Sequence, residues 1–309
     1  MKVTLLAGGT GGAKMAHGFQ HVLEPGELTV IVNVADDAEI HGLHVSPDLD
    51  TVLYTLAGLA NPDTGWGVAG DTWTAMDMLA RLGEPTWFRV GDADLATNLW
   101  RTRLLREGAT LTDVSTALAT ALGVPSHVLP ATDGRLRTIL QTDAGDLEFQ
   151  DYFVRLRQEP AVHGLRLDGL DTARPTEAVL DAIRSAELLV LAPSNPIVSI
   201  GPILALPGVP RAIEATAVAG IPRLAVSPII AGQALKGPAD RMLTSLGHES
   251  SALGVARIYA GLVDTFVLDE ADADLGAAVQ SLGMRALVLR TVMRTDADRA
   301  ALARALLPA

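Results

Sequence analysis

Five acidic side chains lie between residues 36 and 50, immediately after an apolar, β-branched run at 28–34. Carboxylates gathered in this way could bind a divalent cation, or hold or deprotonate a hydroxyl group. The run predicts a buried strand, so the acids follow the carboxyl end of a strand, where ligands bind in open α/β sheets. A solvated loop charge explains any single one equally well, but five together indicate a site. They are Asp36, Asp37, Glu39, Asp48 and Asp50.

Two of these acids belong to the start of a helix. Ser46-Pro47-Asp48 combines an N-cap residue, a proline at the first helical position and an acid in the first turn, which predicts a helix through Leu59. Asp48 and Asp50 would then project near the helix N-terminus. The simpler alternative is that Asp48 only complements the helix dipole.

A glycine-rich loop is a candidate for phosphate binding. Gly8-Gly-Thr-Gly-Gly-Ala-Lys14 stands between a short apolar run, residues 3–7, and an amphipathic stretch to about Val22. Backbone N–H groups at such a strand-to-helix turn can bind phosphate. The loop matches neither the Walker nor the dinucleotide pattern, and a tight turn alone would need only one or two of its four glycines. We predict phosphate binding by Gly9, Thr10, Gly11 and Gly12, with Lys14 either a phosphate ligand or a surface lysine.

A third loop, Pro193-Ser-Asn-Pro196, follows the most apolar predicted strand, residues 188–192. Small polar side chains on a stiff loop suit hydrogen bonding to a nucleotide or a sugar, so Ser194 and Asn195 are predicted to bind ligand. The alternative is a turn in which Asn195 satisfies its own backbone.

Aromatic and basic side chains mark a fourth segment. Trp87-Phe-Arg-Val90 is predicted to be a short strand that ends in Gly91-Asp92, with Arg89 near its end. Trp66, Trp73 and Trp87 could stack on a flat heterocycle, although such rings more often belong to a core.

The composition narrows the classes of function. A net charge of −12 argues against binding to nucleic acid, whose phosphates need a basic surface. The absence of cysteine excludes disulfides, thiolate catalysis and Cys-ligated metals, and no serine lies in a G-x-S-x-G pattern. There is neither a signal-like N-terminus nor an apolar run of membrane-spanning length, so we expect a cytoplasmic protein that does not contact membranes.

The elements that would position these loops alternate between strand and helix. This rhythm predicts an α/β fold with a doubly wound, mostly parallel, Rossmann-like sheet. No polar linker interrupts the chain, so we expect a single domain over residues 1–309. Helices and an antiparallel pair, 137–142 with 147–154, predict an inserted lobe at roughly 70–165. Further strands are predicted at 188–192, 223–226, 265–268 and 286–289, and further helices at 71–82, 94–106, 112–122, 209–219, 238–246, 251–261, 271–282 and 296–307.

Several motifs, in order, resemble the 2-phospho-L-lactate transferases of deazaflavin coenzyme biosynthesis, from Met1 to at least Asp269. The motifs that carry the resemblance are L-A-G-G-T-G-G-A-K (6–14), N-V-A-D-D (33–37), H-G-L-H-V-S-P-D-L-D-T-V-L-Y (41–54), G-W-G (65–67), W-F-R-V-G-D-A-D-L-A-T (87–97), F-Q-D-Y-F-V (149–154), A-P-S-N-P-I-V-S-I (192–200) and S-P-I-I-A-G-Q-A-L-K-G-P-A (227–239).

The resemblance implies a reaction. Members of this family transfer a phospholactyl or phosphoenolpyruvyl group from a guanosine diphosphate-linked donor to the ribityl hydroxyl of Fo, a deazaflavin, which releases GMP and forms coenzyme F-420-0 or its dehydro form. They depend on Mg²⁺ and are usually homodimers. Acceptor-binding positions match Asp50 and Arg89, and nucleotide-binding regions match the glycine loop and Ser194-Asn195.

Within that expectation the acids divide into roles. A carboxylate pair such as Asp37 and Asp50 would repel a diphosphate unless Mg²⁺ lay between them. Asp37, Asp48 and Asp50 are therefore the expected metal ligands, and Asp37 and Asp50 the expected catalytic residues. Asp50 could instead anchor or deprotonate the acceptor hydroxyl, while Asp36 and Glu39 could be solvated neighbours.

The chain departs from the family pattern at four positions. Ala93 and Asn98 replace basic residues, which argues against a role for charge there, and Ala35 and Gln233 replace residues of other types. A related group, the gluconeogenesis factors, shares the glycine loop and Asp36-Asp37 but binds a UDP-sugar and is regulatory. The segment Ala38 to His44 and the P-D-L-D motif favour the transferase over this alternative.

Overall fold

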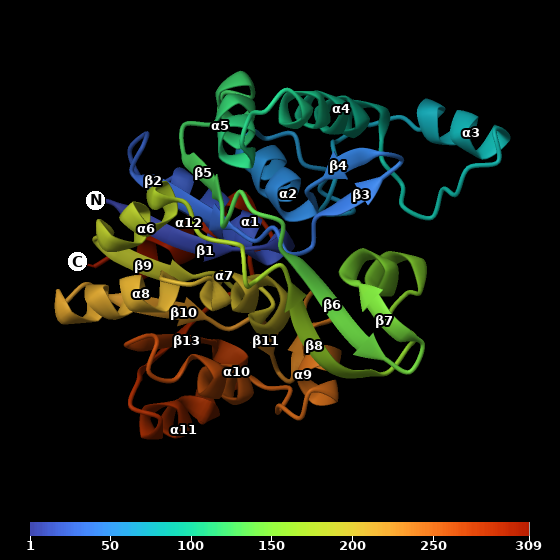
Figure 1. The fold of residues 1–309 in the computed structure, drawn as a ribbon. Helices are drawn as coiled ribbons and strands as arrows, with labels where there is room; N and C mark the ends of the chain where they lie inside the picture. The colour runs from blue at the N-terminus through green and yellow to red at the C-terminus, as the bar shows by residue number, and fades with distance from the viewer. Residues whose placement is uncertain (309) are drawn as a thin grey trace.

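The computed structural model describes residues 1–308 and has a seven-stranded parallel sheet at its centre (Figure 1). This confirms the predicted doubly wound α/β fold. Across the sheet the strands run β14 (Arg285–Leu289), β13 (Thr265–Asp269), β10 (Arg223–Val226), β9 (Leu188–Leu191), β1 (Val3–Ala7), β2 (Leu28–Val32) and β5 (His127–Pro130).

The central strands are apolar on both faces because helices cover both. Successive side chains of a strand point to opposite sides of the sheet. In β1, Leu5 and Ala7 accordingly pack into one core while Leu6 packs into the other. The first face is covered by α1 (Gly9–Gln20), α2 (Pro47–Leu56), α5 (Leu111–Ala121) and α12 (Asp296–Leu306). The second is covered by α6 (Glu177–Arg184), α7 (Gly201–Ala205), α8 (Val209–Val218), α10 (Ala252–Tyr259) and α11 (Gly276–Ser281).

The strand order changes direction at β1. From β1 the chain first builds outward through β2 to β5, and later returns to place β9 on the other side of β1. The loops after β1 and β9 therefore leave the sheet toward different faces, which opens a crevice at their carboxyl ends.

Three small antiparallel sheets flank the main one. They are β3 (Ala38–Ile40) with β4 (Leu43–Val45), β7 (Gly145–Glu148) with β6 (Arg137–Thr142) and β8 (Val162–Asp168), and β11 (Ile229–Ile230) with β12 (Gln233–Ala234). Within residues 70–165, β5 joins the edge of the main sheet, whereas β6 and β7 belong to a separate one. The predicted strand at 147–154 is shorter than expected, because a π-helix, Asp151–Arg155, follows β7.

Other local predictions need correction. Trp87–Val90 is not a strand, because the segment lies outside the sheets and has no strand beside it. The acidic loop contains the β3–β4 hairpin, in which apolar Ala38 pairs with Val45. The helix from Pro47 ends at Leu56 rather than Leu59.

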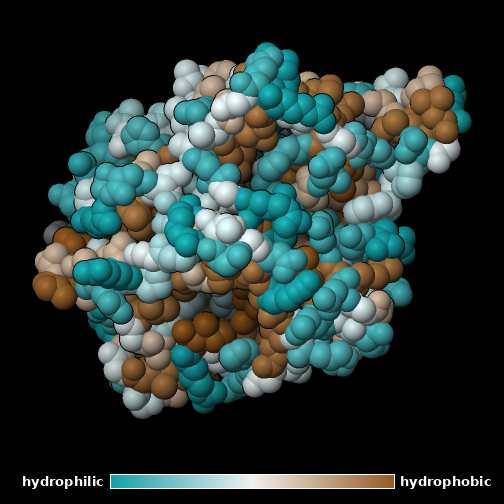
Figure 2. Space-filling model, viewed as in Figure 1, coloured by the Kyte–Doolittle hydropathy of each residue, from teal (hydrophilic) through white to brown (hydrophobic). Residues whose placement is uncertain are grey.

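The remaining elements complete the chain. They are α3 (Thr74–Arg81), α4 (Asp92–Arg106), a π-helix (Pro196–Ile200), α9 (Ala239–Ser245) and a 3-10 helix (Glu270–Leu275). In Figure 1, α3 projects from the body as an arm. Figure 2 shows hydrophobic residues at the tip of this arm, where Met78 and Leu82 are exposed.

Within residues 1–308 no single helix is long and apolar enough to cross a membrane. One pair of helices, Pro196–Ala205 and Val209–Val218, meets the length and composition for a span only when counted together, and it is bent by 84°.

Candidate functional site

A pocket of about 640 Å³ opens at the carboxyl ends of β1 and β9, where the strand order changes direction. It draws its lining from all four loops that the sequence singled out. Of the predicted site residues, those that line it are Gly9, Thr10, Gly11, Lys14, Asp48, Asp50, Arg89, Ser194 and Asn195. Gly12 and Asp37 lie behind this lining.

The glycines of the first loop permit close approach of neighbouring chain. A Cβ on Gly11 would stand 2.2 Å from the carbonyl oxygen of Pro193, and one on Gly12 would stand 2.8 Å from the Ser194 hydroxyl. Only Gly9 has a left-handed backbone, with φ of +60°. These glycines thus let the loops after β1 and β9 pack directly together, which is a structural requirement beside any contact with phosphate.

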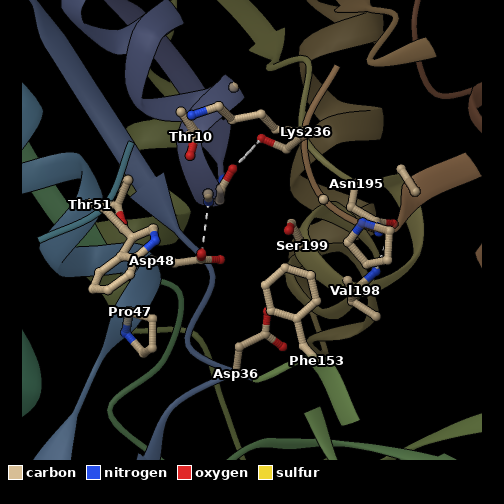
Figure 3. Close-up of a pocket in the computed structure, with 18 of the residues that line it drawn as sticks. Thr10, Asp36, Pro47, Asp48, Thr51, Phe153, Asn195, Val198, Ser199 and Lys236 are labelled. Atoms are coloured by element: carbon tan, nitrogen blue, oxygen red, sulfur yellow. Dashed lines mark hydrogen bonds between the residues drawn. The ribbon is translucent and has the colours of Figure 1, made fainter. Parts of the chain in front are cut away.

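Ser194 and Asn195 hold this junction. The Ser194 hydroxyl donates to the Gly8 carbonyl at 2.7 Å. The Gly8 N–H donates in turn to the Ser194 hydroxyl oxygen at 3.1 Å. The Asn195 side-chain oxygen accepts from the N–H groups of Ile197 and Val198, at 2.9 and 3.3 Å, and so begins the π-helix. Both residues also face the pocket, and in Figure 3 Asn195 and Ser199 lie across it from Thr51 and Asp48.

Asp48 forms hydrogen bonds to the glycine loop and to Asn33. Its Oδ1 accepts from the Gly9 N–H at 2.8 Å, and its Oδ2 accepts from the Asn33 amide at 3.0 Å (Figure 3 shows the first bond). Burial raises the pKa of Asp48 to about 6, although these two hydrogen bonds oppose the rise. The carboxylate is therefore held in a place that disfavours its charge, which a nearby cation would stabilise.

Asp50 forms a buried ion pair with Arg101 of α4. One guanidinium nitrogen of Arg101 donates to Asp50 Oδ2 at 3.1 Å, and the other donates to Oδ1. Arg101 is 1% exposed and also donates to the Asn98 side chain at 2.8 Å. Burial raises the pKa of Asp50, against the effect of Arg101. Asp50 is thus held in one orientation at the pocket wall.

Beside Asp50 lies a second carboxyl group, Asp94, in the first turn of α4. Its Oδ1 accepts from the Tyr54 hydroxyl at 2.9 Å and from the Asn98 amide at 3.3 Å. Burial, and then the charge of Asp50, raise the pKa of Asp94 to about 7. The group lines the pocket, so it can exchange protons near neutral pH.

Arg89 reaches the pocket from the irregular segment before α4. Its guanidinium lies 4.2 Å from the centre of the Trp73 ring, a cation–π contact that orients it. Trp66 and Trp87 also line the pocket, together with Phe149 and Phe153, so aromatic rings surround part of its volume. Trp73 supports Arg89 and does not line the pocket.

The acids Asp36 and Asp37 are suited to a cation. Each has a buried Oδ1 that accepts no hydrogen bond, and Asp36 lines the pocket. Burial, with the charges of Asp48 and Asp37, raises the pKa of Asp36 well above its usual value. Asp36 is 4% exposed, so the expectation of a solvated neighbour is wrong for it, whereas Glu39 is exposed.

The chemistry of this donor set fits Mg²⁺. No three His, Asp or Glu residues among positions 1–308 gather closely enough to hold a metal by themselves. Mg²⁺ commonly uses only one or two carboxylates and completes its shell with water and substrate phosphates. Asp36 and Asp37 offer unpaired oxygens, whereas both oxygens of Asp48 and of Asp50 already accept hydrogen bonds.

Two residues near the site, Asp94 and Arg101, were not predicted to belong to it, and Asp36 was expected to be no more than a solvated neighbour. Asp94, Asn98 and Arg101 are spaced by four and three positions, so they share one face of α4. That spacing was the available signal. Arg103 and Glu107, which pair on the opposite, exposed surface of the helix, indicated instead that its charged side chains lie in solvent.

Comparisons with known proteins show the family to which the chain is similar. Residues 3–297 match the family described as 2-phospho-L-lactate transferase CofD. A 2-phospho-L-lactate transferase of Methanothermobacter thermautotrophicus is 41% identical over 305 residues, covering 99% of this chain and 97% of that protein. A phosphoenolpyruvate transferase of Mycolicibacterium smegmatis is 40% identical over 321 residues, with 99% and 97% covered.

Among solved structures, a member of the UPF0052 family from Bacillus halodurans is similar, with a TM-score of 0.63. The structural alignment covers 99% of this chain and 99% of that protein, at 16% sequence identity. At that identity the likeness concerns the fold alone.

Proposed function

The chain belongs to the CofD family of 2-phospho-L-lactate transferases, and from that premise we propose a Mg²⁺-dependent transfer in F-420 biosynthesis. The donor is a guanosine diphosphate-linked phospholactate or phosphoenolpyruvate, and the acceptor is the ribityl hydroxyl of Fo. The products are GMP and coenzyme F-420-0 or its dehydro form. The observation that carries this proposal is a single pocket that joins the glycine loop, the Ser194 loop, Asp50 and Arg89.

In this reaction the acceptor hydroxyl group loses its proton to solvent, and its oxygen bonds to the phosphorus that carries the acid. The bond between that phosphorus and the bridging oxygen breaks, and GMP leaves with that oxygen. Such a transfer requires mainly positioning and charge stabilisation. Mg²⁺, when bound, would offset the phosphate charge, with Asp36 and Asp37 as the residues best able to hold it.

The chain's own residues have separate tasks in this proposal. The donor phosphates lie against Gly9, Thr10, Gly11 and Lys14. The deazaflavin ring lies against the aromatic side chains that line the pocket, Trp66, Trp87, Phe149 and Phe153. Arg89 contacts the ring or its substituents. Asp50, fixed by Arg101, anchors the ribityl chain. With Arg101 on both of its oxygens, Asp50 serves better as acceptor anchor than as metal ligand.

The test is product formation. Purified protein is incubated with Fo, Mg²⁺ and a mixture of the lactyl-linked and enolpyruvyl-linked guanosine donors, and the products are identified by mass spectrometry. Formation of GMP in equal amount to one F-420-0 species supports the proposal and identifies the acid. Thermal stabilisation by a UDP-sugar, with no effect of Fo or GDP, would instead support the regulatory alternative.

A further inference from the structure

Lysines are rare in this chain and concentrated at the pocket. The sequence has three, Lys2, Lys14 and Lys236, in a protein with a net charge of −12. Lys14 and Lys236 both line the pocket. Lys2 precedes β1 and so lies at the opposite end of the sheet, exposed to solvent. The site therefore brings two of the three lysines to the place where phosphates are expected.

Lys236 reaches the glycine loop from a segment distant in sequence. It stands between β12 and α9, and its ammonium donates to the Thr64 carbonyl at 3.1 Å. The Thr10 hydroxyl donates to the next carbonyl, that of Gly65, also at 3.1 Å. A Cβ on Gly65 would meet Lys236 Nζ at 2.7 Å and Thr10 Cγ2 at 3.2 Å. Lys236 and Thr10 thus adjoin the same point of the loop 61–67, and Figure 3 shows both at one end of the pocket.

The charges at this end of the pocket are uncompensated. Within residues 1–308, neither Lys14 nor Lys236 forms an ion pair with a carboxylate. Burial lowers the pKa of Lys14, and the positive charges of Arg299 and Lys236 lower it further. Two cations that repel each other across a pocket form a place for an anion with several negative oxygens.

The ammonium of Lys236 also has donors to spare. It carries three N–H groups, and the Thr64 carbonyl takes one of them. The other two remain available to phosphate oxygens without loss of the contact with Thr64. A single side chain can therefore bind the donor and the loop 61–67 together, and that loop carries Trp66 into the pocket wall.

We propose that Lys236 binds the diphosphate of the nucleotide donor opposite the glycine loop and, through Thr64, fixes the loop 61–67 over the bound donor. This inference rests on the proposed function for the identity of the donor. Its consequence is coupling: a bound donor orders the wall that Trp66 provides, so the acceptor binds more tightly to the protein that already holds the nucleotide.

Two substitutions separate the charge from the hydrogen bond. Lys236→Met removes both, whereas Lys236→Gln keeps an uncharged donor for the Thr64 carbonyl. Lys2→Met is the matched control, because it removes a lysine remote from the pocket. Because Lys236 is exposed, the variants are expected to fold, and thermal unfolding checks this.

The measurements are the Kd of GDP with Mg²⁺, by calorimetry, and the Kd of Fo with and without GDP. Both Lys236 variants should bind GDP about tenfold more weakly, a modest loss because an exposed contact is screened. They should also lose the improvement in Fo affinity that GDP gives the wild type. Lys2→Met should match the wild type in both.

Other outcomes overturn the inference. Wild-type GDP affinity in both variants would mean that Lys236 does not bind the diphosphate. If Lys236→Met weakens GDP binding but Lys236→Gln does not, the charge of Lys236 does not bind the diphosphate. The role of Lys236 would then be limited to its hydrogen bond with Thr64. If the wild type binds a UDP-sugar and not GDP, the proposed function fails, and the same variants titrated with the UDP-sugar then decide the diphosphate contact by the same criteria.

Discussion

Replacing Arg101 by methionine tests whether its buried ion pair with Asp50 stabilises the pocket wall that contains Asp50. The variant leaves the Asp50 carboxylate, 5% exposed, without its cation. Removing one member of a buried ion pair costs about 3–5 kcal/mol of unfolding free energy. Arg101 also donates to Asn98 and, at 3.3 Å, to the His44 carbonyl, so we expect about 4 kcal/mol. The melting temperature should fall by about 10 °C.

The assay is urea unfolding of the wild type, Arg101→Met, Asp50→Asn and the double variant. Each single substitution leaves the other member of the pair buried without its partner. The double variant should therefore be about 2 kcal/mol more stable than the sum of the two losses predicts. Arg101→Lys serves as a control that keeps the charge but loses the two-pronged contact, and it should recover only part of the loss. Additive losses, or single losses below about 1 kcal/mol, would refute the assignment of a strong buried pair.

Three further results are expected. Asp94→Asn should stabilise the protein at pH 8 by about 4 kcal/mol and have little effect near pH 4. The reason is that the raised pKa of Asp94 makes the folded wild type lose stability as the pH rises from about 4 to about 7. Equal unfolding free energies of variant and wild type at pH 8 would contradict this. Mg²⁺ should raise the melting temperature more at pH 8 than at pH 5, since protonation of the buried acids competes with the metal, and Asp36→Asn should abolish most of that rise in calorimetric scans. Arg89→Ala should raise the KM for Fo about tenfold in steady-state kinetics and leave the Kd of GDP unchanged in calorimetry. Trp73→Ala should raise the KM for Fo by a smaller factor, because it removes only the ring beneath the guanidinium. A weaker binding of GDP to either variant would contradict this assignment.

Six of the seven strands of the main sheet could be predicted from the sequence because their signals are local, whereas the edge strand β5, His127–Pro130, was not predicted. Apolar runs such as 188–192 end in glycine or proline loops, and the helices between them carry caps and a 3.6-residue period. Trp87–Val90 carries the same strand signal but has no neighbouring strand to pair with. Residue type alone cannot supply that neighbour, so this prediction failed.

Side-chain partners in the site could be predicted less well than its loops. Helix α4 contains five charged residues. Only the packed structure distinguishes the buried Arg101 from the exposed Arg103. Likewise Asp36 and Glu39 look alike in sequence, yet one is buried and the other exposed. Burial of a charge depends on neighbours from other segments: Arg101 pairs with Asp50 of α2, and Asp36 lies beside Thr138 of β6, about 50 and 100 residues away in the chain. The homodimer and the cytoplasmic location stay predictions.

The position of β1 at the middle of the sheet affects the order in which the protein can form during synthesis. β2 emerges from the ribosome soon after β1, but β9 begins only at Leu188. Until then one edge of β1, whose five residues are all buried in the finished protein, is unpaired. Unpaired strand edges favour aggregation. The glycine loop also lacks Ser194, the residue that secures it at Gly8. A nascent chain that ends before Leu188 would thus have the acidic loop in place, but the pocket would lack the wall that Ser194 and Asn195 provide.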